Sequence, residues 1–398
     1  MTNSDQIPGG ALLTRARRVV VKIGSALLLD DSGAPAEAWL AGFAADVAAW
    51  REGGTEIVIV SSGAVALGRA KLGLPHRERL EEKQAAAAAG QADLIRAYER
   101  AFAPHRVRLA QILLTREDSD NRRRYLNARA TMTTLLGLGV IPIVNENDTV
   151  ATAEIRYGDN DRLAAHAAQM IGADLLVLLS DVDGLYSADP RRRRDARHIP
   201  FVPEITPEID ALADDRERPA GLGSGGMRTK LDAAKIAARS GCATIIARGA
   251  AIRPLTALRD GARATVFASA TTPARARKLW IGGGLKPSGA IVADDGALLA
   301  LQKGKSLLAA GVCGVEGAFG RGEAVDILAR NGAKIARGLA AYDADEIRAV
   351  QGAKSDEIAI RLGYRRGDEV IHRDDLVMLG AFADHSGSED HEDSDDAA

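Results

Sequence analysis

Residues 19–25 read VVVKIGS, a run of β-branched residues that ends in glycine and serine. This pattern is typical of a buried strand followed by a turn. Similar apolar runs occupy 56–60, 109–114, 140–144, 175–179 and 244–247, and helical patterns at 36–50, 159–171 and 230–238 lie between them. Because strands that alternate with helices form parallel βαβ units, the sequence predicts an α/β fold with an open, mainly parallel sheet and helices on both faces.

Small and polar residues follow most of these predicted strands. KIGS at 22–25 closes the first strand, SSGA at 61–64 follows the second, NEND at 145–148 follows the fourth, and Ser180 and Asp181 follow the fifth. In parallel sheets, ligands bind beyond the carboxyl ends of the strands. We therefore expect ligand binding at that edge of the sheet.

Two segments have features of phosphate binding, although the chain lacks the P-loop pattern GxxxxGK[ST]. Lys22 stands just before Gly24, and the glycine-rich stretch 221–230 (GLGSGGMRTK) leads into a predicted helix. Phosphoryl transfer needs positive charge around the phosphates, and the N-terminus of a helix attracts anions. Each segment taken alone is weak evidence, because a glycine-rich turn before a helix is more often an ordinary connection than a phosphate site, so both interpretations stay open.

The segment 145–161, NENDTVATAEIRYGDND, is the most informative part of the chain. It places five carboxylates and three asparagines in seventeen positions. A solvated loop explains this polarity, but it does not explain why GDND at 158–161 opens a helix that should be partly buried. Carboxylates at this point could cap the helix, orient lysines or hold Mg²⁺. The asparagines and Ser62 could bind the amino and carboxyl groups of an amino acid.

Composition favours a globular protein of the cytoplasm. Hydrophobic residues make up 46% and charged residues 27% of the chain, and no apolar run is long enough to cross a membrane. The N-terminus lacks the pattern of a signal peptide. Cys242 and Cys313 lie in apolar segments, and we expect both to be buried free thiols in a reducing compartment. The histidine spacing gives no reason to expect structural zinc.

The composition changes near residue 271, which indicates a second domain. We expect a flexible N-terminus at 1–15, a first domain at 16–270, a linker at 271–286 and a small β-rich barrel at 287–381. Short apolar runs at 291–293, 298–301, 312–315, 324–328 and 334–339 support the barrel, and one helix is expected at 343–349. The remainder, 382–398, should be a disordered tail, because residues 384–398 carry seven acidic side chains and no Lys or Arg.

Several long motifs resemble the glutamate 5-kinases of the amino-acid kinase family. They are VVKIGS at 20–25, VSSGAVALG at 60–68, LLTREDSDNRRRYLNA at 113–128, NENDTVATAEIRYGDND at 145–161, LLSDVDGLYSADP at 178–190 and GLGSGGMRTKLDAAKIA at 221–237. The stretches 311–327 and 332–347 resemble a PUA domain. The resemblance implies ATP-dependent phosphorylation of the γ-carboxylate of L-glutamate, the first step of proline biosynthesis, with Mg²⁺ supplied alongside ATP.

The resemblance also implies roles for individual residues. Lys22 and Lys230 would stabilise the transferring phosphoryl group, and Asp161 would hold both lysines in place. Glutamate would be bound by Ser62, Asp148 and Asn160. ATP would contact Lys22, Ser180, Asp181, Ser224, Gly225, Gly226, Met227, Arg228, Thr229 and Lys230. Gly24 and Gly63 would offer backbone amides. No dedicated protein site for a metal is implied.

Some alternatives remain open at this level. Acetylglutamate, aspartate or a nucleotide could be the acceptor instead, although the segment 145–161 argues against them. An RNA-binding protein with a kinase-like scaffold should lack the phosphate-site lysines, yet Lys22 and Lys230 are present.

RNA binding is not expected, and the resemblance suggests a homo-oligomer with feedback inhibition by proline. The basic run 191–194 is expected to be a solvated loop, with contact to phosphate or RNA as the alternative. Two positions depart from the family pattern, Ser180 for Thr and Arg156 for Lys.

Overall fold

We describe residues 9–30, 32–74, 79–151, 159–213 and 226–379 of a computed structural model of the chain. The chain divides into two compact units, residues 1–273 and 274–398. Each unit has its own hydrophobic core and is described by itself. Among the described residues, no helix is long and apolar enough to cross a membrane.

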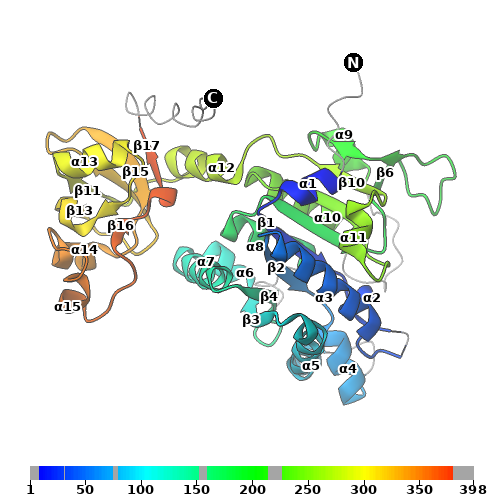
Figure 1. The fold of residues 1–398 in the computed structure, drawn as a ribbon. Helices are drawn as coiled ribbons and strands as arrows, with labels where there is room; N and C mark the ends of the chain where they lie inside the picture. The colour runs from blue at the N-terminus through cyan, green and yellow to red at the C-terminus, as the bar shows by residue number, and fades with distance from the viewer. Residues whose placement is uncertain (1–8, 31, 75–78, 152–158, 214–225, 380–398) are drawn as a thin grey trace, which may run out of the picture. The chain divides into compact units, whose positions relative to one another are not determined.

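The first unit is built on an eight-stranded sheet with the order β3-β4-β2-β1-β5-β9-β10-β8 (Figure 1). The strands are β1 (Arg18–Ile23), β2 (Glu56–Ser61), β3 (Arg108–Leu114), β4 (Val140–Glu146), β5 (Leu175–Ser180), β8 (Phe201–Val202), β9 (Ala243–Arg248) and β10 (Ala264–Phe267). All neighbouring pairs are parallel except β9 and β10. The predicted mainly parallel sheet is confirmed, and the six predicted strands match β1, β2, β3, β4, β5 and β9 to within two residues.

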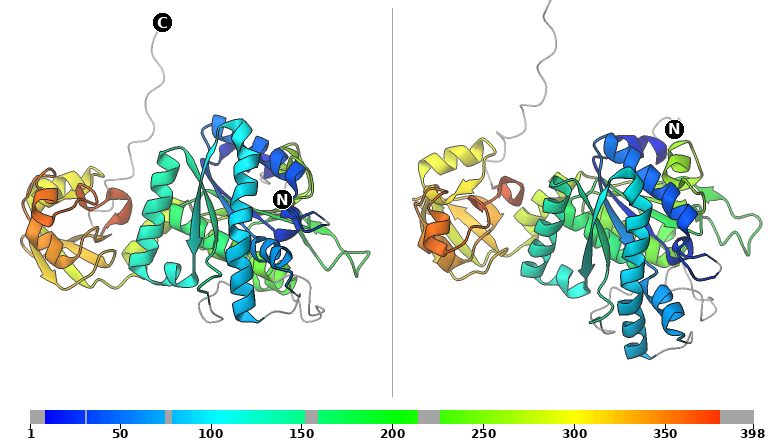
Figure 2. Two further views of the ribbon diagram at one scale, coloured as in Figure 1. Left: turned by 90° about the horizontal axis from the view of Figure 1, so that it is seen from below. Right: turned by 60° about the horizontal axis from the view of Figure 1, so that its bottom comes forward.

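Helices cover both faces of this sheet, as expected (Figure 2). One face packs against α1 (Gly9–Arg15), α3 (Glu37–Glu52), α5 (Leu80–Phe102) and α11 (Pro254–Arg259). The other face packs against α7 (Arg122–Gly137), α8 (Asn160–Ile171) and α10 (Met227–Arg239). Shorter elements are α2 (Ser25–Leu28), α4 (Ala64–Leu72), η1 (Ala103–His105), α6 (Arg116–Asp120), β6 (Leu185–Tyr186), β7 (His198–Ile199) and α9 (Pro207–Ala211).

The alternation of side chains along β1 decides where Lys22 lies. Val19, Val21 and Ile23 belong to the core on the α3 and α5 side, whereas Val20 belongs to the core on the α8 and α10 side. Because successive side chains of a strand point to opposite faces, Lys22 shares the face of Val20. The strand therefore directs this lysine toward the beginnings of α8 and α10.

Helix α5 packs unusually closely against α4, and two glycines allow it. A Cβ added at Gly68 would collide with the backbone oxygen of Ala86, and one added at Gly90 would collide with that of Ala64. The sequence patterns did not predict α5, although it is 23 residues long. At its start, the Glu82 side chain accepts from the backbone N–H of Arg79, the N-cap residue.

The N-terminal segment differs from the expected flexible terminus. Residues 9–15 form α1, in which Leu13 is 3% exposed and packs into the core on the α3 side. Within the predicted linker, residues Pro273–Leu279 form helix α12, and Trp280–Gly284 form a π-helical turn, η2. Residues 382–398, where we expect the acidic tail, lie outside the described residues.

The second unit is small and rich in strands. A five-stranded sheet has the order β13-β11-β14-β15-β17, and β12 pairs with β16. The elements are β11 (Gly289–Ala293), α13 (Asp295–Gln302), β12 (Leu307–Leu308), η3 (Ala309–Gly311), β13 (Val312–Gly317), β14 (Ala324–Leu328), β15 (Lys334–Leu339), α14 (Ala344–Val350), α15 (Ile358–Leu362), β16 (Glu369–Ile371), η4 (Arg373–Asp375) and β17 (Leu376–Met378). The prediction of a β-rich domain is confirmed, but the apolar run 298–301 lies in helix α13 and was wrongly grouped with the strands.

The two cysteines are both free thiols, but only one is fully buried. Cys242 is 1% exposed, and burial raises the pKa of its thiol. Cys313 is only partly buried, and Arg330 Nη2 lies 3.4 Å from its sulfur. The prediction of a buried thiol is therefore correct for Cys242 and wrong for Cys313.

Candidate active site

A buried carboxylate holds two lysines at the carboxyl end of β1. The Nζ atom of Lys22 lies 2.7 Å from Asp161 Oδ1, and the Nζ atom of Lys230 lies 3.1 Å from Asp161 Oδ2. Thr229 Oγ1 also donates to Asp161 Oδ2, at 2.9 Å. Lys22, Lys230 and Asp161 are 8%, 4% and 1% exposed. The structure thus brings together the three residues that the family resemblance placed at the phosphoryl group.

The charges of these three residues do not balance. Burial alone would raise the pKa of Asp161, but the ion pairs with Lys22 and Lys230 outweigh it and lower the pKa to about 2. Asp161 is therefore ionised at neutral pH and compensates one of the two ammonium groups. Within these three residues one positive charge remains, and the buried carboxylate of Asp159 also interacts with Lys22 and Asp161. The two ammonium groups can attract an anion here because the site has little access to water.

Two helices begin at this site and add to its positive potential. Asp161 lies in the first turn of α8, while Thr229 and Lys230 lie in the first turn of α10. The first N–H groups of a helix lack partners within the helix, and its N-terminus carries a partial positive charge. In α8 the N–H of Arg162 already donates to Asp159, whereas α10 has no side-chain cap, so the first N–H groups of α10 suit the oxygens of a phosphate.

The predicted nucleotide loop is in part a helix. Met227, Arg228, Thr229 and Lys230 belong to α10, which begins three residues earlier than predicted, and Gly226 is its N-cap. Arg228 is engaged by the protein, because its Nη2 donates to Asp210 Oδ2 at 2.8 Å. Ser224 and Gly225 lie outside the described residues, as does Arg156.

Ser62 and Asn160 meet beside the lysines. The amide nitrogen of Asn160 donates to Ser62 Oγ at 2.7 Å and to the backbone oxygen of Ser61 at 2.9 Å. Gly63, which follows Ser62, has φ +98° and begins helix α4, so glycine suits this turn. At Gly24, by contrast, an added Cβ would make only an ordinary contact, 3.7 Å from Leu179 O.

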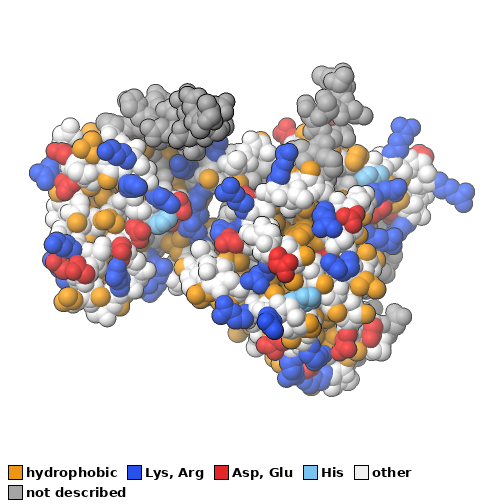
Figure 3. All heavy atoms as spheres, viewed as in Figure 1, with side chains coloured by type: hydrophobic (Ala, Val, Ile, Leu, Met, Phe, Trp, Pro, Cys, Tyr) orange, Lys and Arg blue, Asp and Glu red, His pale blue; other side chains and the backbone are white. Residues whose placement is uncertain are grey.

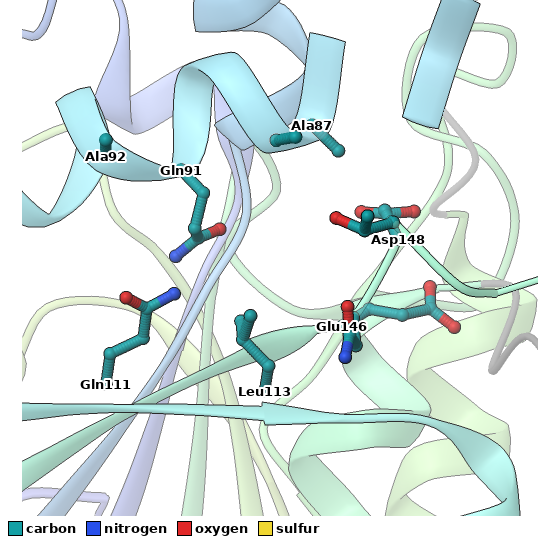
Figure 4. A pocket seen from close by; sticks show the side chains of 10 residues that line it. Ala87, Gln91, Ala92, Gln111, Leu113, Glu146 and Asp148 are labelled. Atoms are coloured by element: carbon teal, nitrogen blue, oxygen red, sulfur yellow. The ribbon is translucent and has the colours of Figure 1, made fainter. Parts of the chain in front are cut away.

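Asp148, the third predicted glutamate ligand, lines a cavity of about 330 Å³ next to α5. Figure 4 shows Glu146 and Asp148 on one side of this cavity and the side chains of Gln91 and Gln111 on the other. Ser62 and Asn160 are not among its lining residues. Lys83 Nζ lies 3.9 Å from Asp148 Oδ1. Of the three predicted ligands of glutamate, Ser62 and Asn160 therefore contact each other, whereas Asp148 lies in a neighbouring cavity.

The predicted nucleotide residues at the end of β5 form a small polar cluster. Ser180 Oγ donates to Asp181 Oδ1 at 2.9 Å, and Arg191 Nη2 donates to Asp181 Oδ2 at 3.0 Å. Burial acts to raise the pKa of Asp181, but the hydrogen bonds from Ser180 and Arg191 outweigh it and lower the pKa. The first arginine of the basic run 191–194 therefore reaches the predicted nucleotide site.

Two residues near the site, Asn145 and Asp159, were considered from the sequence only as members of groups, the asparagines that could bind an amino acid and the carboxylates that could cap a helix. Asn145 Oδ1 accepts from the amide nitrogen of Asn160 at 3.4 Å, and Asn145 Nδ2 donates to Gln91 at 2.8 Å. Asp159 is the N-cap of α8 and is 9% exposed, and burial raises its pKa. The sequence pointed to these two residues only because they lie in the polar segment 145–161. Since most of that segment is polar, its composition could not show which of its residues belong to the site.

Comparison with known proteins shows the family of the chain. The amino acid kinase family model matches residues 17–248, and the PUA domain model matches residues 289–362. Glutamate 5-kinase of Caulobacter vibrioides is 57% identical over 365 residues, which cover 91% of this chain and 97% of the relative. Glutamate 5-kinase of Paramagnetospirillum magneticum is 56% identical over 369 residues, which cover 92% and 99%. The solved structure of a T. acidophilum isopentenyl phosphate kinase is 16% identical, has a TM-score of 0.45 and covers 63% of this chain and 99% of that chain.

The matches to the two glutamate 5-kinases extend over nearly the whole length of this chain and of those relatives. The family motifs quoted from the sequence fall inside the matched residues, and the second unit contains the matched PUA domain. The chain belongs to the amino acid kinase family and, within it, to the glutamate 5-kinases, with a C-terminal PUA domain.

Proposed function

We propose that this chain transfers the γ-phosphoryl group of ATP to the γ-carboxylate of L-glutamate, giving L-glutamyl 5-phosphate in the first step of proline biosynthesis. The observation that carries the proposal is the triad in which Asp161 holds Lys22 and Lys230 at 2.7 and 3.1 Å, beside the pair Ser62 and Asn160. The surplus positive charge of the triad suits the phosphoryl group. The neighbouring hydroxyl and amide suit the polar ends of an amino acid.

The reaction needs positioning and charge stabilisation more than proton transfer. A carboxylate with an ordinary pKa near 4.3 is ionised at neutral pH, so the acceptor attacks without a general base. A bond forms between a carboxylate oxygen and the γ-phosphorus, the bond from that phosphorus to the bridging oxygen breaks, and ADP leaves with the electron pair. Lys22 and Lys230 stabilise the charge on the transferring group in the transition state.

The residues of the site fit Mg²⁺ that arrives on the nucleotide better than a cage made by the protein. Both oxygens of Asp161 are taken by lysines, and Asp159 is a single buried carboxylate nearby. Mg²⁺ in kinases is usually held by substrate phosphates and one or two carboxylates, with waters in the other positions. When bound, it neutralises negative charge on the phosphates.

The acceptor can be tested directly. With ATP and Mg²⁺, the purified protein should convert L-glutamate into an acyl phosphate that hydroxylamine traps as a hydroxamate. Release of ADP should be measured in parallel with L-glutamate, N-acetylglutamate, aspartate and UMP at equal concentrations. We expect the highest kcat/KM with L-glutamate. Faster turnover of any other acceptor would contradict the proposal, since Ser62, Asp148 and Asn160 were assigned to glutamate.

Asp148→Asn should separate substrate binding from chemistry. The substitution keeps the shape of the side chain but removes the charge that we expect to contact the ammonium group of glutamate. Loss of a contact present in the ground state appears mainly in KM. We expect KM for glutamate to rise about tenfold or more, as for a hydrogen bond to a charged group, with kcat and KM for ATP near their original values. A large fall in kcat with unchanged KM would move Asp148 from substrate binding to catalysis.

The remaining parts of the proposal concern assembly, regulation and location. We propose a homo-oligomer that is inhibited by proline and resides in the cytoplasm, where the free thiol of Cys242 would stay reduced. We propose no RNA ligand for the PUA domain. Basic and acidic side chains are interspersed on the face of this unit seen in Figure 3, whereas RNA binding requires a basic surface.

A further inference from the structure

Helix α5 contacts the back of the site that we propose for glutamate. Tyr98 and Gln91 lie two turns apart on α5 and therefore on the same face of the helix. Tyr98 reaches Ser61 at the end of β2, and Gln91 reaches Asn145 at the end of β4. Both partners contact the amide nitrogen of Asn160. Two polar chains thus connect α5 to one substrate-binding amide.

The direction of the hydrogen bonds at Tyr98 follows from a count of protons. Ser61 Oγ lies 3.0 Å from the Tyr98 hydroxyl and 3.0 Å from the backbone oxygen of Ser62. A carbonyl oxygen can only accept, so the single proton of Ser61 Oγ goes to Ser62 O. Tyr98 must then donate to Ser61 Oγ. Burial raises the pKa of Tyr98, so its hydroxyl keeps the proton that this bond requires.

This arrangement fixes the turn that carries Ser62. Ser61 shares the face of Ile57 and Ile59, which pack toward α3 and α5, and it is fully buried like Tyr98. The Ser61 hydroxyl holds the peptide of Ser62, and the Ser61 carbonyl accepts from Asn160. The Tyr98 hydroxyl therefore holds Ser61, whose own hydroxyl bonds the carbonyl of Ser62 and whose carbonyl bonds Asn160.

We propose that Tyr98 is a positioning residue for the acceptor, which acts through Ser61 to hold Ser62 and Asn160 in the geometry that binds glutamate. The proposal rests on the proposed function, because it takes Ser62 and Asn160 as ligands of glutamate. Positioning of this kind strengthens ligand binding, because polar groups that are already held in the binding arrangement lose less conformational freedom when the ligand binds. The two lysines of the phosphate site lie on β1 and α10, outside the turn that Ser61 holds, so we expect KM for ATP to be unchanged.

Tyr98→Phe tests the proposal because it removes one oxygen and keeps the ring in the core with Phe102 and Phe43. We expect KM for glutamate to rise about 3- to 10-fold, the effect of one net hydrogen bond, with KM for ATP unchanged. Ser61→Ala should have a similar effect. Because both substitutions break the same chain, the double variant should resemble Ser61→Ala alone.

Tyr342→Phe is the matched control. Tyr342 is also 0% exposed, and its hydroxyl donates to Gly367 O at 2.7 Å, but it lies in the second unit. This variant should lower the melting temperature and leave KM for glutamate unchanged. If Tyr98→Phe likewise lowered only the melting temperature, with KM for glutamate within about twofold of the original, the proposal would be wrong and Tyr98 would be a core residue only.

Ser62→Ala distinguishes this inference from the proposed function. A rise in KM for glutamate in Ser62→Ala, together with an unchanged KM in Tyr98→Phe, would overturn the role of Tyr98 and leave the glutamate site intact. An unchanged KM in Ser62→Ala would overturn the glutamate site itself and the role of Tyr98 with it. Full-length protein should be used for all of these variants, and each should be checked for its oligomeric state.

Discussion

Lys230→Ala should lower kcat about 10²- to 10³-fold while it changes KM for glutamate little. Lys230 is 4% exposed and its ammonium group is held 3.1 Å from Asp161 in the first turn of α10. The positive charge of Lys230 stabilises the transferring phosphoryl group most in the transition state, when negative charge develops on that group. The effect is large because the Lys230 ammonium group is fixed in a site shielded from water. Steady-state rates of ADP release at saturating glutamate and ATP would measure the effect.

Lys235→Ala is the control for this prediction. Lys235 lies on the same helix and forms an ion pair with Asp210 at 2.5 Å, so the variant also removes a paired lysine from α10. It has no assigned role in the site, and we expect kcat to stay near its original value. If Lys230→Ala kept a near-normal kcat, Lys230 would have no part in the chemical step.

The sequence alone predicted the sheet well because its strands are buried on both faces. The runs that became β1, β2 and β5 are almost continuous stretches of Val, Ile and Leu, a pattern typical of parallel strands. The rule that ligands bind at the carboxyl ends of such strands then pointed to Lys22, Ser62 and Ser180. The contact between Lys22, Asp161 and Lys230 was expected only from the family resemblance. These residues lie far apart in the sequence, and the sequence alone does not show how close they are in the folded protein.

Helix α5 shows why part of the site was missed. Its inward-facing positions include Ala86, Ala87 and Gly90, small residues that allow close packing against α4 and provide no large apolar side chains in this part of the helix. Tyr98 and Gln91 therefore stood in a segment without a predicted element. In the second unit, the run 298–301 was too short for its period to distinguish a strand from a helix. The N-cap Asp294, which accepts from the backbone N–H of Ala297, was the available signal for α13.

Asp161→Asn should destabilise the protein by about 3–5 kcal/mol at neutral pH, the usual cost of removing one partner of a buried ion pair. The substitution keeps the size of the side chain but leaves Lys22 and Lys230 buried without a counter-charge. We also expect a large fall in kcat, because both ammonium groups lose the carboxylate that positions them. Urea-induced unfolding monitored by circular dichroism would measure the change in stability.

Asp46→Asn provides the control, because Asp46 is likewise 1% exposed and is bonded to Arg253 Nε at 2.5 Å and to the backbone N–H of Leu255 at 2.9 Å. It lies on α3, on the other face of the sheet from Asp161. This variant should lose stability but keep the kcat and KM of the original protein in conditions where it is folded. A similar loss of kcat in both variants would mean that destabilisation, and not the triad, explains the effect of Asp161→Asn.

The pH dependence of the stability gives an independent check on the charge of Asp161. Its pKa is lowered from 3.8 to about 2 in the folded protein, so folding favours the ionised form. The stability that this shift contributes is complete above the unfolded pKa near 3.8 and is lost as the pH falls toward 2. The difference in unfolding free energy between the original protein and Asp161→Asn should therefore shrink as the pH is lowered from 5 toward about 3, within the range where both fold. If this difference in unfolding free energy stayed constant over this range, the two lysines would not lower the pKa of Asp161 in the folded protein.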